Sequence, residues 1–284
     1  MYDEFVPRGG DLHNPLRLET APIRLGAGKT GVLLLHGYLA TPAEMRGLAE
    51  YLAARGLRVH APRVAGHGTS LRELCRTTWR DWYASVEEAY ARLQTECSRV
   101  FAAGMSLGGL QALHLAAHHP ELAGVAALAP PVAVFFDERR PWRRASDMKL
   151  WLLSRMPWLA GLYRGESSDA APRFLHADIR DEAARQRRVY YRFNPARGVL
   201  ELLKYAAVVR AELAQITQPL LLLHSPLDHT VPRRSVELAY AGVSSTEKVL
   251  DTTTAANSWH VLVEDVDAEL VFAAVHRFIA KHVP

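Results

Sequence analysis

Five consecutive residues, Gly104-Met105-Ser106-Leu107-Gly108, form the pattern in this chain that is best suited to chemistry. They follow the apolar run 100–103 and precede a segment, 109–118, in which apolar residues recur at helical spacing. A tight turn between a strand and a helix strains its central residue and exposes it at the carboxyl end of the strand. The pattern therefore indicates that the hydroxyl of Ser106 is a nucleophile. A glycine-rich turn that only packs a helix on a sheet is the alternative interpretation, and it leaves the exposed serine unexplained.

A serine hydroxyl is a poor nucleophile at neutral pH, so it requires a base that is held by a third group. On sheets with this kind of turn, the chain order is serine, then acid, then histidine, each on a loop after a later strand. Asp228 follows the apolar run 220–223, and His260 lies between a strand candidate ending near residue 250 and the final helix. We predict Asp228 as the acid and His260 as the base.

Other residues compete for both roles. Asp251 and Asp265 are possible acids, but each lies too near His260 in the sequence to occupy a separate strand end. His36 follows a strand candidate, where a loop-bracing role is expected. Order and loop position favour His260 over the rest of the 13 histidines, among them His114, His118, His119, His224 and His229.

Acyl transfer through a serine also needs two amide donors for the negative oxygen of the tetrahedral intermediate. One is expected to be the backbone N–H of Leu107, directly after the nucleophile. The other is expected in the loop after the strand candidate 31–35, where Gly37 permits a tight turn and the Tyr38 amide follows it. We predict Tyr38 and Leu107 as the oxyanion donors.

Short apolar runs alternate with longer segments of helical period, a pattern that predicts an α/β fold with a mainly parallel sheet and helices on both faces. The sequence Thr41-Pro42-Ala43-Glu44 predicts a capping box, with Glu44 reaching back to the start of a helix that ends before Gly56. Further helices are expected over 78–96, 199–213 and 267–282. The expected strands are 31–35, 57–61, 100–104, 124–128, 220–224 and 247–250.

One segment, residues 132–194, interrupts the alternation and contains no clear strand. We interpret it as an inserted helical cap on a core domain formed by residues 1–131 and 195–284. Its apolar side chains predict a pocket for an acyl chain over the serine, with Trp142, Trp151, Met156 and Trp158 as candidate substrate-binding residues. Four arginines beside Trp142 suit a lipid surface, but we favour a solvated charged face, so we expect at most weak membrane association.

Composition and charge narrow the possible partners, metal ligands and cellular location. The formal net charge of +4 in 284 residues comes from basic residues spread along the chain, which argues against a nucleic-acid partner. Cys75 and Cys97 lack the spacing of a zinc site, and we expect no metal. Asp3 and Glu4 stand where a signal peptide needs basic residues, and no apolar run is long enough to span a bilayer, so a cytoplasmic location is expected.

Several sequence blocks resemble the bacterial carboxylesterase and monoacylglycerol lipase family of α/β-hydrolases. The resemblance runs from about residue 31 to the C-terminus, and the order and spacing of the blocks agree. Besides the serine turn, the blocks are Val32-Leu33-Leu34-Leu35-His36-Gly37-Tyr38, Thr41-Pro42-Ala43-Glu44-Met45, Pro62-Arg63-Val64-Ala65-Gly66-His67-Gly68-Thr69, Thr78-Trp79-Arg80-Asp81-Trp82, Asp228 with Val231-Pro232, and Ser258-Trp259-His260-Val261.

The resemblance implies the α/β-hydrolase fold and cofactor-free ester hydrolysis by Ser106, Asp228 and His260. Family members act on short- to medium-chain esters or monoacylglycerols, and here the cap is longer and richer in Trp and Arg, which leaves the substrate range open. A serine at residue 106 argues against dehalogenases and epoxide hydrolases, which need a carboxylate there. The sequence also permits a thioesterase, an acyltransferase, a peptidase or a non-catalytic ligand-binding protein. It does not decide the oligomeric state.

Overall fold

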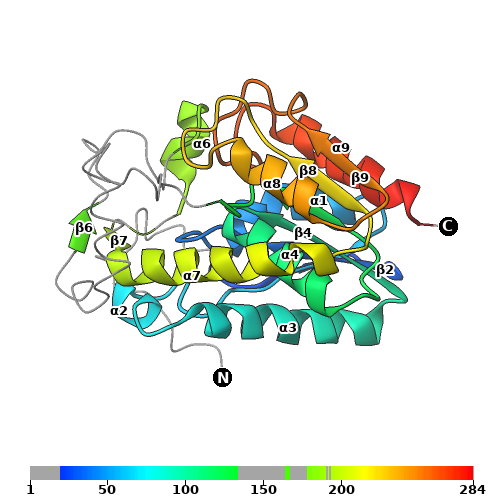
Figure 1. Ribbon diagram of the computed structural model, residues 1–284, viewed down its shortest axis with the longest axis horizontal. Helices are drawn as coiled ribbons and strands as arrows, with labels where there is room; N and C mark the ends of the chain where they lie inside the picture. The colour runs from blue at the N-terminus through cyan, green and yellow to red at the C-terminus, as the bar shows by residue number, and fades with distance from the viewer. Residues whose placement is uncertain (1–19, 134–163, 167–177, 190, 192, 284) are drawn as a thin grey trace.

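A seven-stranded sheet runs through the middle of the molecule, with helices on both of its faces (Figure 1). The computed structural model describes residues 20–133, 164–166, 178–189, 191 and 193–283. Along the sheet the order is β1-β3-β2-β4-β5-β8-β9, and only β1 is antiparallel to its neighbour. The strands are β1 (Ile23–Leu25), β2 (Thr30–Leu35), β3 (Arg58–Ala61), β4 (Arg99–Met105), β5 (Val125–Leu128), β8 (Leu220–Leu223) and β9 (Lys248–Asp251).

The helices divide between the two faces. Alternate residues of a strand point to opposite faces, so Val32 and Leu34 of β2 pack toward α1 and α9, whereas Leu33 and Leu35 pack toward α3, α4 and α7. The bounds are η2 (Pro42–Met45), α1 (Arg46–Ala53), α2 (Leu71–Leu74), α3 (Trp79–Glu96), α4 (Leu107–His118), α6 (Glu182–Arg187), α7 (Ala196–Glu212), η5 (Leu213–Gln215), α8 (Arg234–Gly242) and α9 (Ala268–Lys281).

The strand order reverses beside β2. From β2 the chain passes to β3 on one side, and it then returns to form β4 on the other side. β2 and β4 are parallel and in register from Thr30↔Arg99 to Leu35↔Gly104, so their carboxyl ends lie side by side. Such a reversal leaves a crevice outside the carboxyl ends of the strands, which is where ligands bind in open α/β sheets.

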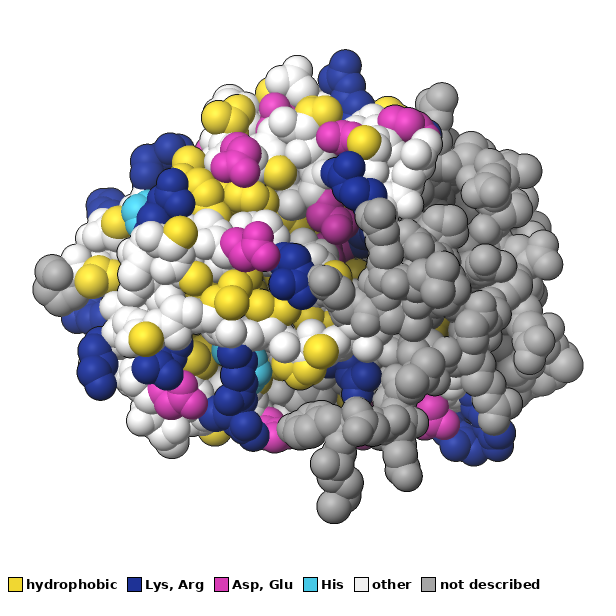
Figure 2. All heavy atoms as spheres, turned by 180° about the vertical axis from the view of Figure 1, so that it is seen from behind, with side chains coloured by type: hydrophobic (Ala, Val, Ile, Leu, Met, Phe, Trp, Pro, Cys, Tyr) yellow, Lys and Arg dark blue, Asp and Glu magenta, His cyan; other side chains and the backbone are white. Residues whose placement is uncertain are grey.

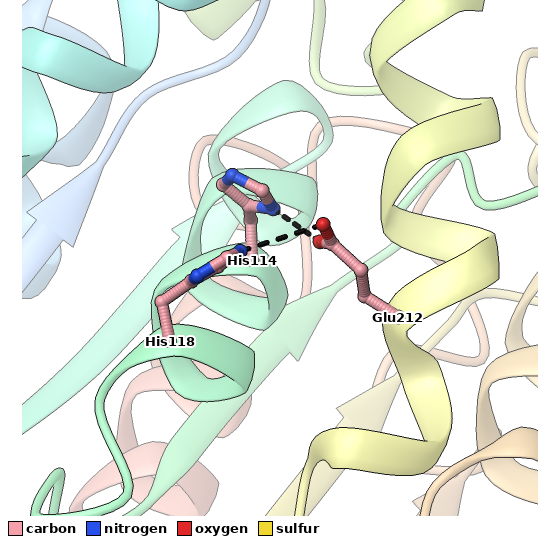
Figure 3. Close-up of side chains that lie close together, drawn as sticks. All are labelled: His114, His118 and Glu212. Carbon is pink, nitrogen blue, oxygen red and sulfur yellow. Dashed lines mark hydrogen bonds and ion pairs between the residues drawn. The ribbon is translucent and has the colours of Figure 1, made fainter.

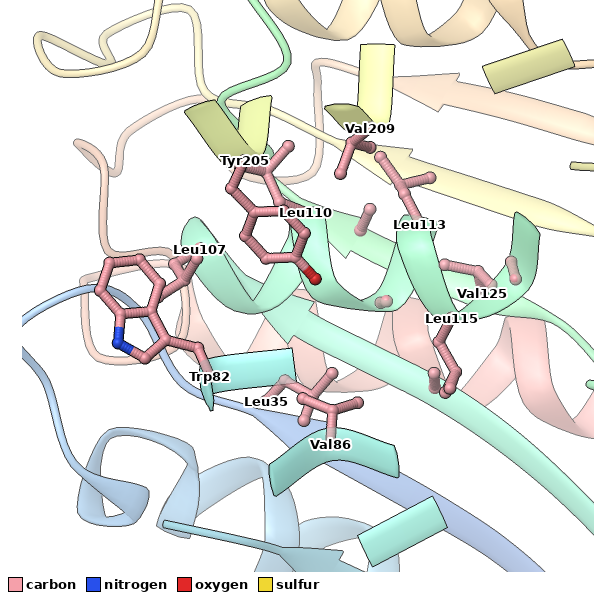
Figure 4. Close-up of a cluster of buried hydrophobic side chains, with 14 of the residues drawn as sticks. Leu35, Trp82, Val86, Leu107, Leu110, Leu113, Leu115, Val125, Tyr205 and Val209 are labelled. Atoms are coloured by element: carbon pink, nitrogen blue, oxygen red, sulfur yellow. The ribbon is translucent and has the colours of Figure 1, made fainter. Parts of the chain in front are cut away.

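Helix α4 is the most deeply enclosed helix segment near this crevice. All of its residues from Leu107 to Ala116 are buried. Figure 4 shows Leu110 and Leu113 of α4 with Tyr205 and Val209 of α7, and Trp82 and Val86 of α3 lie on the other side of the helix. Because α4 is held by the sheet and by two helices, the residue at its N-terminus has a fixed position.

The mainly parallel sheet with helices on both faces agrees with the sequence-based expectation, and the six predicted strands are present to within one or two residues. The expectation of no strand between residues 132 and 194 was wrong, since β6 (Arg164–Glu166) pairs with β7 (Phe193–Pro195) in a small antiparallel sheet. The edge strand β1 and the helix α8 were not predicted. Three-residue strands such as β1 and β6 are too short to show a period.

The predicted capping box at Thr41 was half right. The Thr41 hydroxyl accepts a hydrogen bond from the Ala43 amide at 3.3 Å, as expected. The Glu44 side chain accepts a hydrogen bond from the amide of Gly37, at 2.5 Å, which the capping box did not predict.

On the face shown in Figure 2, Lys and Arg side chains are interspersed with acidic and apolar ones. This mixed distribution agrees with the basic residues being spread along the chain. Within the described part of the chain, no helix combines the length and the apolar character that crossing a membrane requires.

Glycine at residue 108 decides how closely α4 approaches the sheet. A Cβ atom there would lie 2.0 Å from the carbonyl oxygen of Leu35 in β2. The backbones of α4 and β2 can separate only at a cost in packing energy. We therefore expect Gly108→Ala to lower the free energy of unfolding by about 3 kcal/mol. Urea unfolding followed by circular dichroism measures the change.

Gly56 provides the matched control. It has a φ of +83° but open space around its Cβ position, so Gly56→Ala meets only the cost of the left-handed backbone, about 1 kcal/mol. If the two variants were equally stable, the steric argument at Gly108 would be wrong.

Candidate active site

Ser106 lies at the turn between β4 and α4, where the backbone is strained. Its φ of 53° and ψ of −112° fall outside the regions that residues with side chains normally adopt. The amide of Ser106 donates to the Leu128 carbonyl at 2.8 Å, and its carbonyl accepts from the Leu110 amide at 3.1 Å, so neighbouring strand and helix both hold the turn. A Cβ at Gly104 would meet the Gly108 carbonyl oxygen at 2.1 Å, which explains why the turn needs glycines on both sides of the serine.

Asp228 and His260, predicted as acid and base, are in direct contact. The Nδ1 atom of His260 lies 2.8 Å from Oδ2 of Asp228. The other oxygen, Oδ1, accepts hydrogen bonds from the amides of Thr230 at 2.8 Å and Val231 at 2.7 Å. These bonds fix the carboxylate and leave one oxygen for the imidazole.

The pKa values of the pair move in opposite directions. Burial alone would raise the pKa of Asp228, but the charge of His260 and the hydrogen bond between them outweigh it, and the pKa lies below its ordinary value. Burial alone would lower the pKa of His260, but the attraction of Asp228 and the same hydrogen bond raise it above the ordinary value. The arrangement therefore stabilises a carboxylate beside an imidazole that can accept a proton.

Ser106 and His260 line the same cavity, which opens where β2 and β4 end. Apolar atoms of Met105, Leu202 and Val261 also line it. The structure thus brings together the three residues that the sequence predicted, Ser106 and His260 in the cavity wall and Asp228 behind the histidine. A strained serine beside an imidazole and a carboxylate can perform nucleophilic chemistry.

The predicted oxyanion donors lie on the two elements that flank this cavity. Tyr38 lines the cavity, and Leu107 is the first residue of α4, so its N–H has no carbonyl partner within the helix. Among the hydrogen bonds of the described residues, none uses the amide of Tyr38. The turn around Tyr38 is tight, with Leu39 at a φ of 63°.

A buried glutamate that the sequence analysis assigned only to a helix cap lines the cavity. Glu44 accepts the Gly37 amide and forms an ion pair with Arg188. Arg188 also pairs with Glu264 at 2.6 Å, and its side chain is only 6% exposed. A buried charge without a partner is costly, so Glu44 and Arg188 hold each other and thereby hold the loop that precedes Tyr38.

Asp178 is a second buried residue near the candidate site that the sequence analysis did not identify. Its carboxylate accepts hydrogen bonds from the His229 amide at 3.1 Å and the Thr230 hydroxyl at 2.8 Å. Its backbone carbonyl accepts from the amides of His260 at 3.0 Å and Val261 at 3.2 Å. One residue therefore connects the loop that carries Asp228 to the loop that carries His260.

Most of the competing candidates have other partners. The Nε2 atom of His224 lies 3.5 Å from Oδ2 of Asp228, but it is hydrogen-bonded to the Val231 carbonyl at 3.0 Å. Asp251 accepts hydrogen bonds from Thr253 and Thr254 within its own turn, and Asp265 accepts the amides of Arg180 and Trp259. The Nε2 atom of His36 accepts a hydrogen bond from the Val64 amide at 3.2 Å, which agrees with a loop-bracing role. The candidate acyl-pocket residues Trp142, Trp151, Met156 and Trp158 lie outside the described residues.

The sheet order, the turn at Ser106 and the position of the cavity are those of an α/β-hydrolase. The sequence profile of the family described as "Serine aminopeptidase, S33" matches residues 27–267. The chain belongs to this family, and it is a hydrolase. This assignment confirms the resemblance to bacterial carboxylesterases and monoacylglycerol lipases.

The chain is similar to several known proteins over nearly its whole length. A thermostable monoacylglycerol lipase of Bacillus sp. (strain H-257) is 34% identical over 94% of this chain and 97% of the relative. A carboxylesterase of Bacillus subtilis (strain 168) is 27% identical over 92% of this chain and 96% of the relative. The solved structure of a metagenome-derived lipolytic enzyme superimposes with a TM-score of 0.78 and 30% identity, covering 93% of this chain and 98% of the other.

The ion pair of Glu44 leads to a stability prediction. Glu44→Gln removes one of the two carboxylates that pair with the buried Arg188, so we expect the free energy of unfolding to fall by about 2 kcal/mol in urea titrations. Glu50→Gln on the neighbouring helix is the control, because the Glu50 side chain is 59% exposed and lies 3.7 Å from Arg46. That variant is expected to change stability by less than about 0.5 kcal/mol, and similar losses in both variants would contradict the role of Glu44.

Proposed function

We propose that this hydrolase cleaves carboxylic esters through an acyl-enzyme on Ser106, with Asp228 and His260 completing a catalytic triad. The observation that carries the proposal is the Asp228–His260 contact of 2.8 Å behind a cavity that His260 shares with Ser106. The names of the relatives support the ester as the bond that is cleaved, since they are a monoacylglycerol lipase and a carboxylesterase.

Acylation begins with a proton transfer. Because His260 donates its Nδ1–H to Asp228, its Nε2 atom is the acceptor for the proton of the Ser106 hydroxyl. The serine oxygen attacks the ester carbonyl as the proton leaves, and a tetrahedral intermediate forms. The negative Asp228 stabilises the imidazolium that results.

The intermediate carries a negative oxygen, which needs donors that are already in position. The amides of Tyr38 and Leu107 are the proposed donors, and the N-terminus of α4 adds the partial positive charge of the helix. Collapse of the intermediate breaks the ester bond, and the imidazolium gives its proton to the leaving alcohol. Water then attacks the acyl-enzyme with His260 as base, and the free acid and Ser106 are restored.

The proposed substrates are short- to medium-chain acyl esters or monoacylglycerols. The apolar atoms of Met105, Leu202 and Val261 in the cavity wall favour an acyl chain over a charged group. The part of the pocket that the sequence assigned to Trp142 and Trp158 remains a prediction. Rates on p-nitrophenyl esters of increasing chain length, compared with acyl-CoA thioesters and aminoacyl amides, rank esterase activity against thioesterase and peptidase activity.

The nucleophile is tested by covalent labelling. We expect a fluorophosphonate probe to label the folded protein, and Ser106→Ala to abolish labelling and lower kcat about 10⁶-fold, since the acyl-enzyme cannot form without the hydroxyl. Ser98→Ala, which removes an exposed serine just before β4, is expected to keep full labelling. A wild-type protein that is folded but unlabelled would defeat the proposal.

The pH dependence of kcat/KM reports the protonation of His260. The base must be neutral to accept the serine proton, and Asp228 raises its pKa above the ordinary value, so activity is expected to fall as the pH drops below a midpoint higher than 6.5. His119→Ala is the control, because glutamates also raise the pKa of His119, which binds Glu87 and Glu121 on another part of the surface. An acid midpoint below 6.5, or one that moves in the control, would argue against His260 as the base.

A further inference from the structure

A cluster of two histidines and a glutamate lies at the far end of the helix that begins at Ser106. His114 and His118 are one turn apart on α4, and Glu212 is the last residue of α7. Figure 3 shows both imidazoles directed toward the Glu212 carboxylate. The Nδ1 atom of His114 lies 2.6 Å from one carboxylate oxygen, and Nε2 of His118 lies 3.4 Å from the other.

We propose that His114, His118 and Glu212 form a binding site for a divalent transition-metal ion, with Zn²⁺ as the best fit. One ligand atom from each residue can be chosen so that all three lie within 4.8 Å of one another. Tetrahedral zinc with bonds of about 2.0–2.1 Å requires ligand atoms roughly 3.3 Å apart, so shifts of up to about 1.5 Å are enough. His118, whose side chain is 46% exposed, can move to make them.

Two imidazoles and a carboxylate are a ligand set that zinc accepts, with a fourth position for water. A metal ligand must be deprotonated, and here the ion takes the place of the proton between His114 and Glu212. The exposed side of His118 gives the ion access from solvent.

Local electrostatics also favours a cation at this place. Both α4 and α7 end at the cluster, and the C-terminus of a helix carries partial negative charge. A glutamate at the end of α7 is therefore unfavourable unless a positive group is near it. Among the described residues, the ion pairs of Glu212 are with His114 and His118, and both histidines come from the end of α4.

The proposed ion has a structural role. His114 is eight residues from Ser106, about 12 Å along the helix axis, so a metal there cannot contact the ester. It would connect the end of α4 to the end of α7, and Leu202 of α7 lines the cavity of the candidate active site. We expect metal binding to raise thermal stability without supplying a catalytic group.

Untagged protein, freed of metal with EDTA and desalted, is titrated with ZnCl₂ by calorimetry and heated with and without the ion. We expect one Zn²⁺ per chain and a rise of about 5 °C in Tm at a hundredfold excess over Kd. His118→Ala and Glu212→Gln are expected to weaken binding at least about tenfold and to remove the rise in Tm. Co²⁺ bound at the same place should show visible absorption that both variants lose.

His119→Ala is the matched control, since His119 is the next residue but bonds to Glu87 and Glu121 instead. It is expected to bind Zn²⁺ as the wild type does. No binding by the wild-type protein would overturn the proposal. Binding that persists unchanged in both His118→Ala and Glu212→Gln would also overturn it, because the ion would then lie elsewhere.

Discussion

The candidate site depends on how closely the backbone of α4 approaches β2 and β4. Gly108 lies against the carbonyl of Leu35, and Gly104 lies against the carbonyl of Gly108, so neither position has room for a Cβ. This contact forces Ser106 into a backbone conformation that costs about 1–3 kcal/mol. Burial of nearly the whole of α4 supplies the compensation, because a helix fixed on both sides by apolar packing cannot relax to relieve one strained turn. The core of the protein is thus what keeps the serine hydroxyl raised into the cavity.

Polar contacts position the rest of the site, whereas apolar packing positions the serine. Asp228, Glu44 and Asp178 are all buried carboxylates, and each accepts a backbone N–H from a loop at the cavity. A buried donor or acceptor that loses its partner costs about 1–3 kcal/mol, so each of these bonds restricts the loop to one conformation. The loops at the carboxyl edge of the sheet have little regular structure of their own. Hydrogen bonds to buried carboxylates therefore fix the conformation of these loops, as hydrogen bonds between neighbouring strands fix the sheet.

The sequence predicted what local patterns encode. Apolar runs located the six parallel strands, and the glycines around Ser106 identified the turn. Chain order then selected Asp228 and His260, which the structure brings to 2.8 Å. The short strands β1, β6 and β7 were missed because three residues do not establish a period, and β1 owes its existence to pairing with β3. The boundaries of the cap and the roles of the site residues remain predictions.

Glu44 shows why the remaining contacts of the site could not be predicted from the sequence. Its local sequence fits a capping box, which needs only a Thr three residues earlier, but its partner in the fold is Arg188, 144 residues away. The Arg188 guanidinium neutralises the buried carboxylate of Glu44, which a helix-terminal amide alone would not do. Local sequence rules fail where the partner of a residue lies far away in the sequence. Such failures are expected at functional or strained sites. Glu212 breaks a local rule in the same way, since its acidic side chain stands at the negative end of α7, and the neighbouring histidines of α4 give a physical reason for its presence there.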